Sequence, residues 1–308
     1  MRATLHALTE ELRRLKTAGV STVSVSEESL ATLRKIVADR AAAVAPAQAP
    51  APAATSAGEP AAPSWTPSST PRAASKPAKP AAATLPPPPA VNLPDGDKQT
   101  RWDALLAAVK DDSVCAKQLR PGKQVVLGVG SLDARIFFCG EAPGAEEELQ
   151  GEPFVGPAGQ LLTKMIAGMG LKREDVYIGN IMNWRPQLPT IDGVEQVGNR
   201  PPTPEEMAYC LPYLRAQLEI VNPDVVVALG STAAKGLLGP ESFTTLGEIR
   251  GKWQTFAGKP VMVTYHPSYI LRNQSNRSKR MIWEDLLQVM EKTELPISDK
   301  QRGYFQSR

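Results

Sequence analysis

Proline is concentrated in one part of the chain, and this distribution limits where a folded domain can lie. Of the 29 prolines among 308 residues, 14 lie between positions 46 and 94, interleaved with alanine, serine and threonine. The stretch carries few large apolar side chains, so it cannot bury enough apolar area to offset the entropy lost on ordering. The sequence therefore predicts a disordered linker over 46–97.

The residues before the linker carry two helical patterns. Leucines recur at helical spacing between positions 5 and 15, and a capping box at Ser26 opens a second pattern that extends to about 44. A segment of about 40 residues is marginal as an independent fold. We interpret 1–45 as a helical N-terminal segment that docks on other structure. Whether it recruits a specific protein partner is left open.

After the linker, short apolar runs alternate with helical patterns. This alternation predicts a three-layer α/β/α domain over 98–295 with a central, mainly parallel sheet, followed by a C-terminal tail at 296–308. Ligands bind such sheets at the carboxyl ends of the strands, so the loops that follow the strands form the candidate site. Strands are expected at 125–127, 135–139, 175–178 and 224–229, with an antiparallel or edge pair at 252–256 and 260–265; helices are expected at 99–112, 157–168, 203–221, 277–292 and from position 230.

Composition excludes several classes of protein. A net charge of +3 excludes a histone-like polycation but leaves a local basic patch open. No apolar run approaches the ~20 residues of a membrane span, and no signal-peptide pattern follows the N-terminus. Three scattered cysteines cannot form a disulfide framework, so we expect a cytoplasmic protein. The two histidines of the chain are too few for a poly-histidine metal centre.

A glycine-rich acidic loop follows the expected strand 135–139. Gly140 and Gly144 let the backbone approach a ligand closely, and five glutamates lie within or beside the loop. A solvated acidic face or a turn that only caps a helix would give the same pattern. The next segment, 151–160, holds a single aromatic residue, Phe154, among glycines and prolines. Phe154 is a candidate stacking platform, although a lone phenylalanine is usually a core residue.

Two polar side chains stand where other strands end. Asn180 follows 175–178, and its amide offers one donor and one acceptor to a planar base edge; the alternative is an asparagine that caps a turn. His266 follows 260–265 and is the only histidine of the expected domain. It is a candidate general acid or hydrogen-bond donor, and a structural histidine is the alternative.

Basic residues without an intervening acid follow His266. A basic first helical turn is unfavourable with the helix dipole, so this pattern favours contacts to phosphates, with a solvated helix start as the alternative. The residues are Arg272, Arg277, Lys279 and Arg280.

Together these loops resemble those of the uracil-DNA glycosylase superfamily, specifically its family-4 type. The resemblance spans roughly 100–292 and does not cover 1–97. It rests on 140–148, 151–162, 176–180, Arg185-Pro186, 250–253 and 266–272.

The resemblance implies a four-stranded parallel sheet between helices and the removal of uracil from DNA after the nucleotide is flipped out of the duplex. It implies that Phe154 stacks on the uracil, that Asn180 reads its polar edge beside Gly140 and Gly144, and that His266 stabilises the departing base. Glu141 would lie in the motif that holds the attacking water, and Glu147 would shape the pocket in the same stretch. Ser268 to Arg272 would press into the duplex, which makes Ser268 a DNA contact.

One departure from the resemblance is large. The family binds a four-iron, four-sulfur cluster with four cysteines, of which this chain matches two, Cys115 and Cys210. Trp184 stands where a third ligand is expected, directly before Arg185-Pro186. Two thiolates cannot hold such a cluster, so we expect no iron–sulfur cluster and no other metal or cofactor. The stretch 188–196 also lengthens the loop after Pro186.

The sequence thus predicts a monomeric DNA-repair hydrolase that acts on uracil-containing DNA and starts base-excision repair. Two alternatives belong to other classes. One is a uracil- or DNA-binding member of the same superfamily with altered catalysis. The other is a module associated with DNA polymerase or a scaffold, in which the N-terminal helices matter most.

Overall fold

The sheet of the domain has six strands, where four were expected, because two antiparallel edge strands extend its parallel centre. In the computed structural model, which describes residues 85–188 and 198–306, the strand order is β1-β3-β2-β4-β6-β5. The central strands β3, β2, β4 and β6 run parallel to one another, while β1 and β5 pair antiparallel at the two edges. The bounds are β1 Val129–Gly130, β2 Ile136–Gly140, β3 Tyr177–Asn180, β4 Val225–Leu229, β5 Trp253–Phe256 and β6 Lys259–Thr264.

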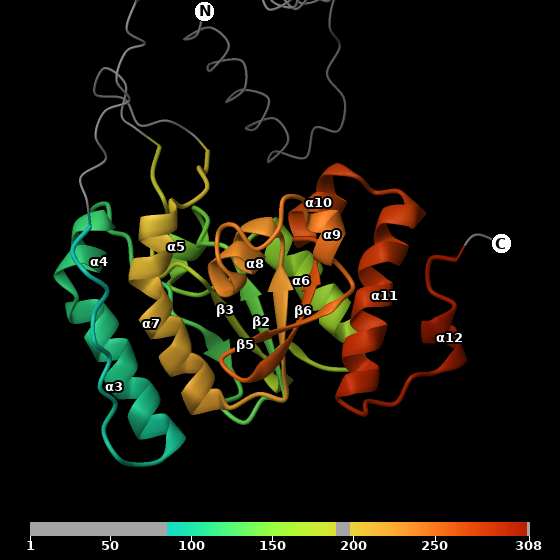
Figure 1. The fold of residues 1–308 in the computed structure, drawn as a ribbon, viewed down its shortest axis with the longest axis horizontal. Coiled ribbons are helices and arrows are strands. Elements are labelled where there is room, and N and C mark those ends of the chain that lie inside the picture. The colour runs from blue at the N-terminus through green and yellow to red at the C-terminus, as the bar shows by residue number, and fades with distance from the viewer. Residues whose placement is uncertain (1–84, 189–197, 307–308) are drawn as a thin grey trace, which may run out of the picture. The chain divides into compact units, whose positions relative to one another are not determined.

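Helices cover both faces of this sheet, which confirms the expected three-layer α/β/α fold. Figure 1 shows α3 and α7 on one side of the strands and α6 and α11 on the other. The helices are α3 Lys98–Asp111, α4 Ser113–Gln118, α5 Glu147–Gln150, α6 Pro157–Gly168, α7 Pro204–Val221, α8 Ser231–Leu238, α9 Leu246–Ile249, α10 Pro267–Arg272, α11 Asn276–Lys292 and α12 Asp299–Arg302, with a short 3₁₀ turn, η1, at Arg173–Asp175.

The strand residues alternate between two apolar cores. In β2, Phe137 and Cys139 pack with the α3 and α7 side, whereas Ile136 and Phe138 pack with the α6 and α11 side. Every residue of β2 and β4 is buried, as expected for central parallel strands covered on both faces. The four central strands therefore end side by side in a rigid frame.

Residues 125–127 are not a strand. The predicted apolar run is buried, but Val126 N–H bonds to Asn183 O in a loop instead of joining a ladder. The edge strand forms two residues later, at β1. Burial was correctly indicated by the apolar side chains, whereas the ladder depends on a distant partner that local sequence does not show.

The domain is longer at both ends than predicted. Leu85, Val91 and Leu93, placed in the expected linker, are partly buried against the core. Within the expected tail, α12 packs on α11: Trp283 Nε1 donates to Gln301 O at 2.6 Å, and Gln301 Nε2 donates to Gly168 O at 2.9 Å. A few apolar anchors are enough to hold these polar segments. The expected segment 1–45, and the linker up to residue 84, lie outside the described residues.

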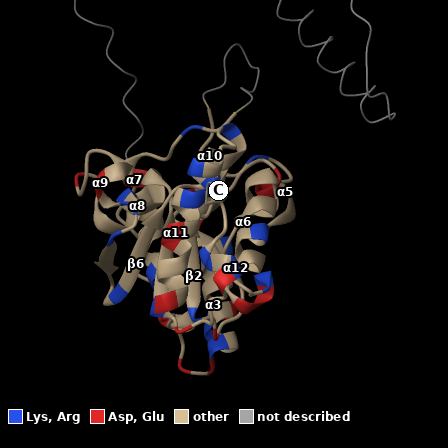
Figure 2. Cartoon of the chain, turned by 90° about the vertical axis from the view of Figure 1, so that its right-hand side faces the viewer, with Lys and Arg blue, Asp and Glu red and all other residues tan. Residues whose placement is uncertain are grey.

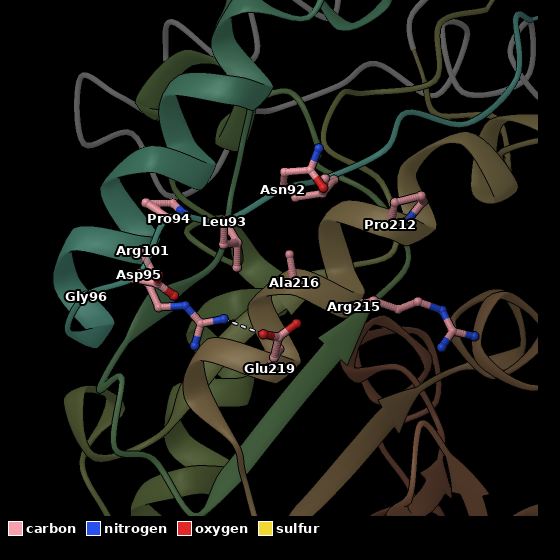
Figure 3. Close-up of a pocket in the computed structure, with 11 residues that line it drawn as sticks. Asn92, Leu93, Pro94, Asp95, Gly96, Arg101, Pro212, Arg215, Ala216 and Glu219 are labelled. Carbon is pink, nitrogen blue, oxygen red and sulfur yellow. Dashed lines mark hydrogen bonds and ion pairs between the residues drawn. The ribbon is translucent and has the colours of Figure 1, made fainter.

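The added N-terminal stretch borders a cavity of about 660 Å³. Figure 3 shows this cavity between residues 91–96, α3 and α7, with the ion pair of Arg101 and Glu219 across it. It shares no residue with the pocket at the strand ends described next. Among the described residues, no helix combines the length and the apolar character of a membrane span.

Candidate active site

A pocket of about 590 Å³ opens at the carboxyl ends of the central strands. Each parallel strand contributes to it: Glu141 follows β2, Asn180 ends β3, Gly230 follows β4, and His266 follows β6. The site therefore lies where the fold rule for parallel sheets places a ligand. Phe154, Glu147, Gly144, Ser268 and Arg272 also line this pocket, so nine of the residues named from the sequence lie at or directly beside it once Gly140 is included.

Phe154 forms one wall of the pocket in an unusual backbone conformation. Its φ is +55°, a left-handed value that costs a non-glycine residue roughly 1–2 kcal/mol. The side chain is 6% exposed, and its ring centroid lies 5.7 Å from that of His266, with 32° between the ring planes. A Cβ at Gly140 would come within 2.5 Å of the Phe154 ring and 2.4 Å of Asn180 Oδ1, so only glycine fits there.

Glu147 holds the loop that carries Phe154. One carboxylate oxygen accepts the N–H groups of Val155 (3.2 Å) and Gly156 (3.1 Å), and the other accepts the N–H of Gly144 (3.1 Å). With both oxygens engaged by backbone, this carboxylate organises the loop, which fits its expected part in shaping the pocket. Glu141, by contrast, lines the pocket without a side-chain hydrogen bond to the described residues, so its carboxylate is available to a water molecule.

The Asn180 amide is also available to a ligand. The residue is 6% exposed and is held by the β2–β3 ladder, in register with Gly140. Among the described residues no group pairs with its side-chain amide, which faces the pocket. A buried amide without a partner is costly unless a ligand or water pairs with it. Asn180 is therefore suited to read a planar polar edge.

His266 is held as a neutral hydrogen-bond donor. It caps α10, where its Nδ1 accepts the N–H of Ser268 at 3.2 Å and lies 2.9 Å from Ser268 Oγ. An accepting Nδ1 assigns the hydrogen to Nε2. Burial, with a smaller effect of the Arg272 charge, lowers the pKa of His266 to about 4, while Glu147 acts weakly in the opposite direction. The imidazole is thus uncharged at neutral pH.

A buried ion pair supports the strand that leads to His266. Arg250 Nη1 donates to Asp285 Oδ1 at 2.7 Å and Oδ2 at 2.8 Å, and Thr264 Oγ1 donates to Asp285 Oδ2 at 2.6 Å. Burial raises the pKa of Asp285 to about 6, although the bonds from Thr264 and Arg250 act to lower it. The group joins α11 to the end of β6. Asp285 was not predicted, because nothing in the local sequence marks it as the partner of Arg250.

The basic residues after His266 divide into two groups. Arg272 lines the pocket, Arg277 is exposed, and Lys279 is half-buried on the first turn of α11. Figure 2 shows several segments of Lys and Arg, in blue, on the ribbon around α10. Arg280 does not fit the expectation that it contacts DNA. Its guanidinium donates to Glu284, to Arg302 O and to Tyr304 O, so it fastens the C-terminal segment to α11.

Four pocket residues were not predicted. Gly230, Ser231 and Thr232 form the start of α8, a helix whose first turn has no side-chain cap, and they lie on the pocket rim. Uncapped backbone N–H groups at a helix start attract anions. Asn199 follows the lengthened loop and is fixed by Arg185, whose Nε donates to Asn199 Oδ1 at 2.8 Å. The glycine-serine pair after a buried strand was the available signal for α8; Asn199 had none.

Cys115 and Cys210, the two cysteines that the resemblance matches to cluster ligands, lie in the same buried core. Trp184 is buried in the same apolar core, and burial raises the pKa of both thiols well above the usual range. Asp112, three residues before Cys115, accepts the hydroxyls of Tyr209 and Tyr213 at 2.7 Å each. In the described part of the chain, no three histidine, cysteine or acidic side chains are grouped to hold a metal.

Comparison with known proteins agrees with this geometry. The profile of the family described as "Uracil DNA glycosylase superfamily" matches residues 127–287. The type-4 uracil-DNA glycosylase of Thermotoga maritima is 45% identical over 181 residues, which cover 58% of this chain and 87% of that protein. The type-4 enzyme of Archaeoglobus fulgidus is 47% identical over 152 residues, covering 47% and 71%. A type-5 uracil-DNA glycosylase of Pyrobaculum aerophilum is 33% identical over 176 residues, covering 52% and 71%.

The family match extends over more than half of the chain and includes the ends of β2, β3, β4 and β6, where the pocket lies. The chain therefore belongs to the uracil DNA glycosylase superfamily.

Proposed function

We propose that this protein is a uracil-DNA glycosylase, a hydrolase that breaks the bond between uracil and deoxyribose and so starts base-excision repair. The observation that carries the proposal is one pocket with four complementary groups. These are the Phe154 ring, the unpaired Asn180 amide, the neutral His266 imidazole and the free Glu141 carboxylate. The relatives named above are glycosylases of this type.

The pocket suits a base that has left the DNA stack. A pyrimidine ring inside a duplex cannot reach a buried pocket, so the nucleotide must rotate outward. Phe154 then stacks on one face of the ring, and the Asn180 amide pairs with an adjacent carbonyl and N–H of its edge. Gly140 keeps the space between these two side chains open.

The chemistry separates two charges. When the glycosidic bond breaks, its electron pair leaves with the uracil and the sugar becomes cation-like. His266 Nε2–H donates to the uracil oxygen on which negative charge grows, and the imidazole needs no proton from solvent to do so. Glu141 holds a water that adds to the sugar carbon, and its negative charge stabilises the cation. The hydroxyl of that water ends on the sugar, and its proton balances the released base.

The rim of the pocket suits a nucleic-acid backbone. Arg272, Arg277 and Lys279 bring positive charge, and Ser268 and the uncapped start of α8 bring hydrogen-bond donors. Leu271, on α10, is 41% exposed and is placed to press into the base stack. We leave Arg280 out of this set because its guanidinium is bound within the protein.

We further propose that the protein works without an iron–sulfur cluster, as a monomer in the cytoplasm. The absence of a cluster is supported by the apolar surroundings of Cys115 and Cys210. It is also supported by Trp184, which stands where a third ligand is expected. Support for the location is that all three cysteines of the chain are free and buried.

The direct test is abasic-site formation on a uracil-containing oligonucleotide. We expect the wild-type protein to release uracil. The His266→Ala variant should release it at least about 100-fold more slowly, which is the usual effect of removing one preorganised donor. Affinity for uracil-free DNA should remain, because it depends on backbone contacts. A wild-type protein that binds uracil DNA without releasing uracil would instead identify a binding protein with altered catalysis.

The pH dependence of excision tests the neutral histidine. The pKa of His266 is lowered to about 4, so the imidazole stays neutral as the pH falls from 7 to 5, and the single-turnover excision rate should not rise over this range. The free energy of unfolding should decrease as the pH falls. The contribution of His266 to it is complete above the unfolded pKa of about 6.5 and decreases between that pH and about 4. An excision rate that rises between pH 7 and pH 5 would require imidazolium and contradict this assignment.

Iron analysis tests the proposed absence of the cluster. Protein purified without oxygen should contain less than about one iron per chain and show no visible iron–sulfur absorption, because two thiols cannot supply four ligands. Replacing both Cys115 and Cys210 by serine should leave the excision rate within about twofold, apart from a loss of stability from polar burial. Stoichiometric iron that the double variant loses would show that the cluster is present.

Salt-dependent DNA binding separates the two groups of basic residues. Replacing Arg277 and Lys279 together by alanine should weaken binding and reduce the salt slope by roughly one unit for each lost phosphate contact. Lys110→Ala with Lys117→Ala, on α3 and α4, removes the same charge elsewhere and should leave the slope nearly unchanged. Arg280→Ala should mainly lower the free energy of unfolding, by about 1–3 kcal/mol. Equal slopes for the first two double variants would refute the assignment.

A further inference from the structure

Arg173 holds the loop of Phe154 from outside the pocket. It lies in η1, directly before β3, and is not among the residues that line the pocket. Its Nη2 donates to the carbonyl oxygen of Pro153 at 2.5 Å. This bond links the start of the strand that ends in Asn180 to the residue that precedes Phe154. The two sides of the base pocket are thereby joined through one guanidinium.

The peptide groups on both sides of Phe154 are held by side chains of opposite charge. Arg173 binds the carbonyl before it, and Glu147 binds the two N–H groups after it. Gly159 completes this arrangement, because a Cβ there would lie 1.8 Å from Phe154 O. A left-handed φ of +55° persists only where the surroundings determine it. Arg173 provides the part of that restraint that acts on the preceding peptide.

The charge and burial of Arg173 suit a side chain that positions the Phe154 loop better than one that stabilises the whole fold. Burial lowers the pKa of Arg173, while the nearby charges of Glu152 and Glu147 raise it, and a guanidinium stays charged throughout the range of pH in which proteins fold. Its Nη1 is buried without a hydrogen-bond partner among the described residues. Removing the side chain therefore removes a desolvation cost together with one good bond, and the two changes offset each other in the free energy of unfolding.

We propose that Arg173 is a positioning residue for base stacking, which keeps the Phe154 ring in place to receive a flipped-out pyrimidine. The proposal rests on the function proposed above and extends it to a residue that touches no substrate. When the bond to Pro153 is lost, Phe154 is free to relax toward negative φ, and its ring leaves the position opposite His266. Binding of uracil and the rate of its excision then fall together.

The test compares Arg173→Met with Arg173→Lys in the full-length protein. Methionine keeps the length of the side chain without a donor, whereas lysine keeps the charge and one donor. Arg135→Met is the matched control, because Arg135 pairs with Asp224 through Nε at 2.6 Å and does not line the pocket. Four quantities are measured: the single-turnover excision rate, the Kd of free uracil by calorimetry, the Kd of a uracil-free oligonucleotide and the Tm.

We expect Arg173→Met to excise uracil roughly 10- to 100-fold more slowly, the scale of a small misplacement of a substrate-positioning group. Its Kd for free uracil should rise several-fold, while its Kd for uracil-free DNA and its Tm stay close to those of the wild type. Arg173→Lys should recover part of both losses, and Arg135→Met should show neither.

Two results would overturn the proposal. One is an Arg173→Met protein that binds free uracil and excises it like the wild type. The other is a protein that loses activity together with a large fall in Tm and is not rescued by lysine, which would make the role purely structural. A wild-type protein that binds free uracil but releases none from DNA would overturn the proposed function alone, since uracil binding by the variants still tests Arg173.

Discussion

The shape of the pocket depends on the three backbone N–H groups that Glu147 accepts. They come from Gly144, Val155 and Gly156, so one carboxylate joins the loop that follows β2 to the loop that enters α6. A charge-assisted hydrogen bond is about twice as strong as a neutral one, and three on one group fix the path of the backbone between them. The backbone that follows Phe154 takes its path from this contact. The parallel strands supply the rigid frame to which these loops are attached.

The sequence predicted the layers of the fold and the loops of the site because both have local signals. Alternating apolar runs gave the central strands, and glycine, proline and polar residues marked the strand ends around Asn180 and His266. Features that depend on distant partners were not predictable in this way. The edge strand β1 needs β3, and Asp285 becomes important only because Arg250 and Thr264 meet it in space. Arg280 shows the converse, since its basic pattern indicated DNA while its hydrogen bonds hold the C-terminal segment.

The cysteine region shows how a resemblance and a structure inform each other. The resemblance draws attention to Cys115 and Cys210, and the structure shows what surrounds them: Trp184, 1% exposed, and an Asp112 carboxylate bound by two tyrosine hydroxyls. The half-buried Asp112 carboxylate accepts several hydrogen bonds and so joins α4 to α7. Trp184 Nε1 is buried without a hydrogen-bond partner in the part of the chain that the structure describes. The three backbone N–H groups that bind Glu147 all come from other loops, at Gly144, Val155 and Gly156.

The left-handed backbone of Phe154 has a consequence for how quickly a base is accepted. The unfavourable free energy of this backbone conformation is offset during folding. Gly159 leaves room for the backbone to turn there. The aromatic surface is therefore already in place in the protein without DNA. Discrimination between bases then depends on the fixed shape of the pocket. A base that is too large for this pocket is excluded before the glycosidic bond is distorted. The enzyme can therefore test many nucleotides without a conformational change for each one.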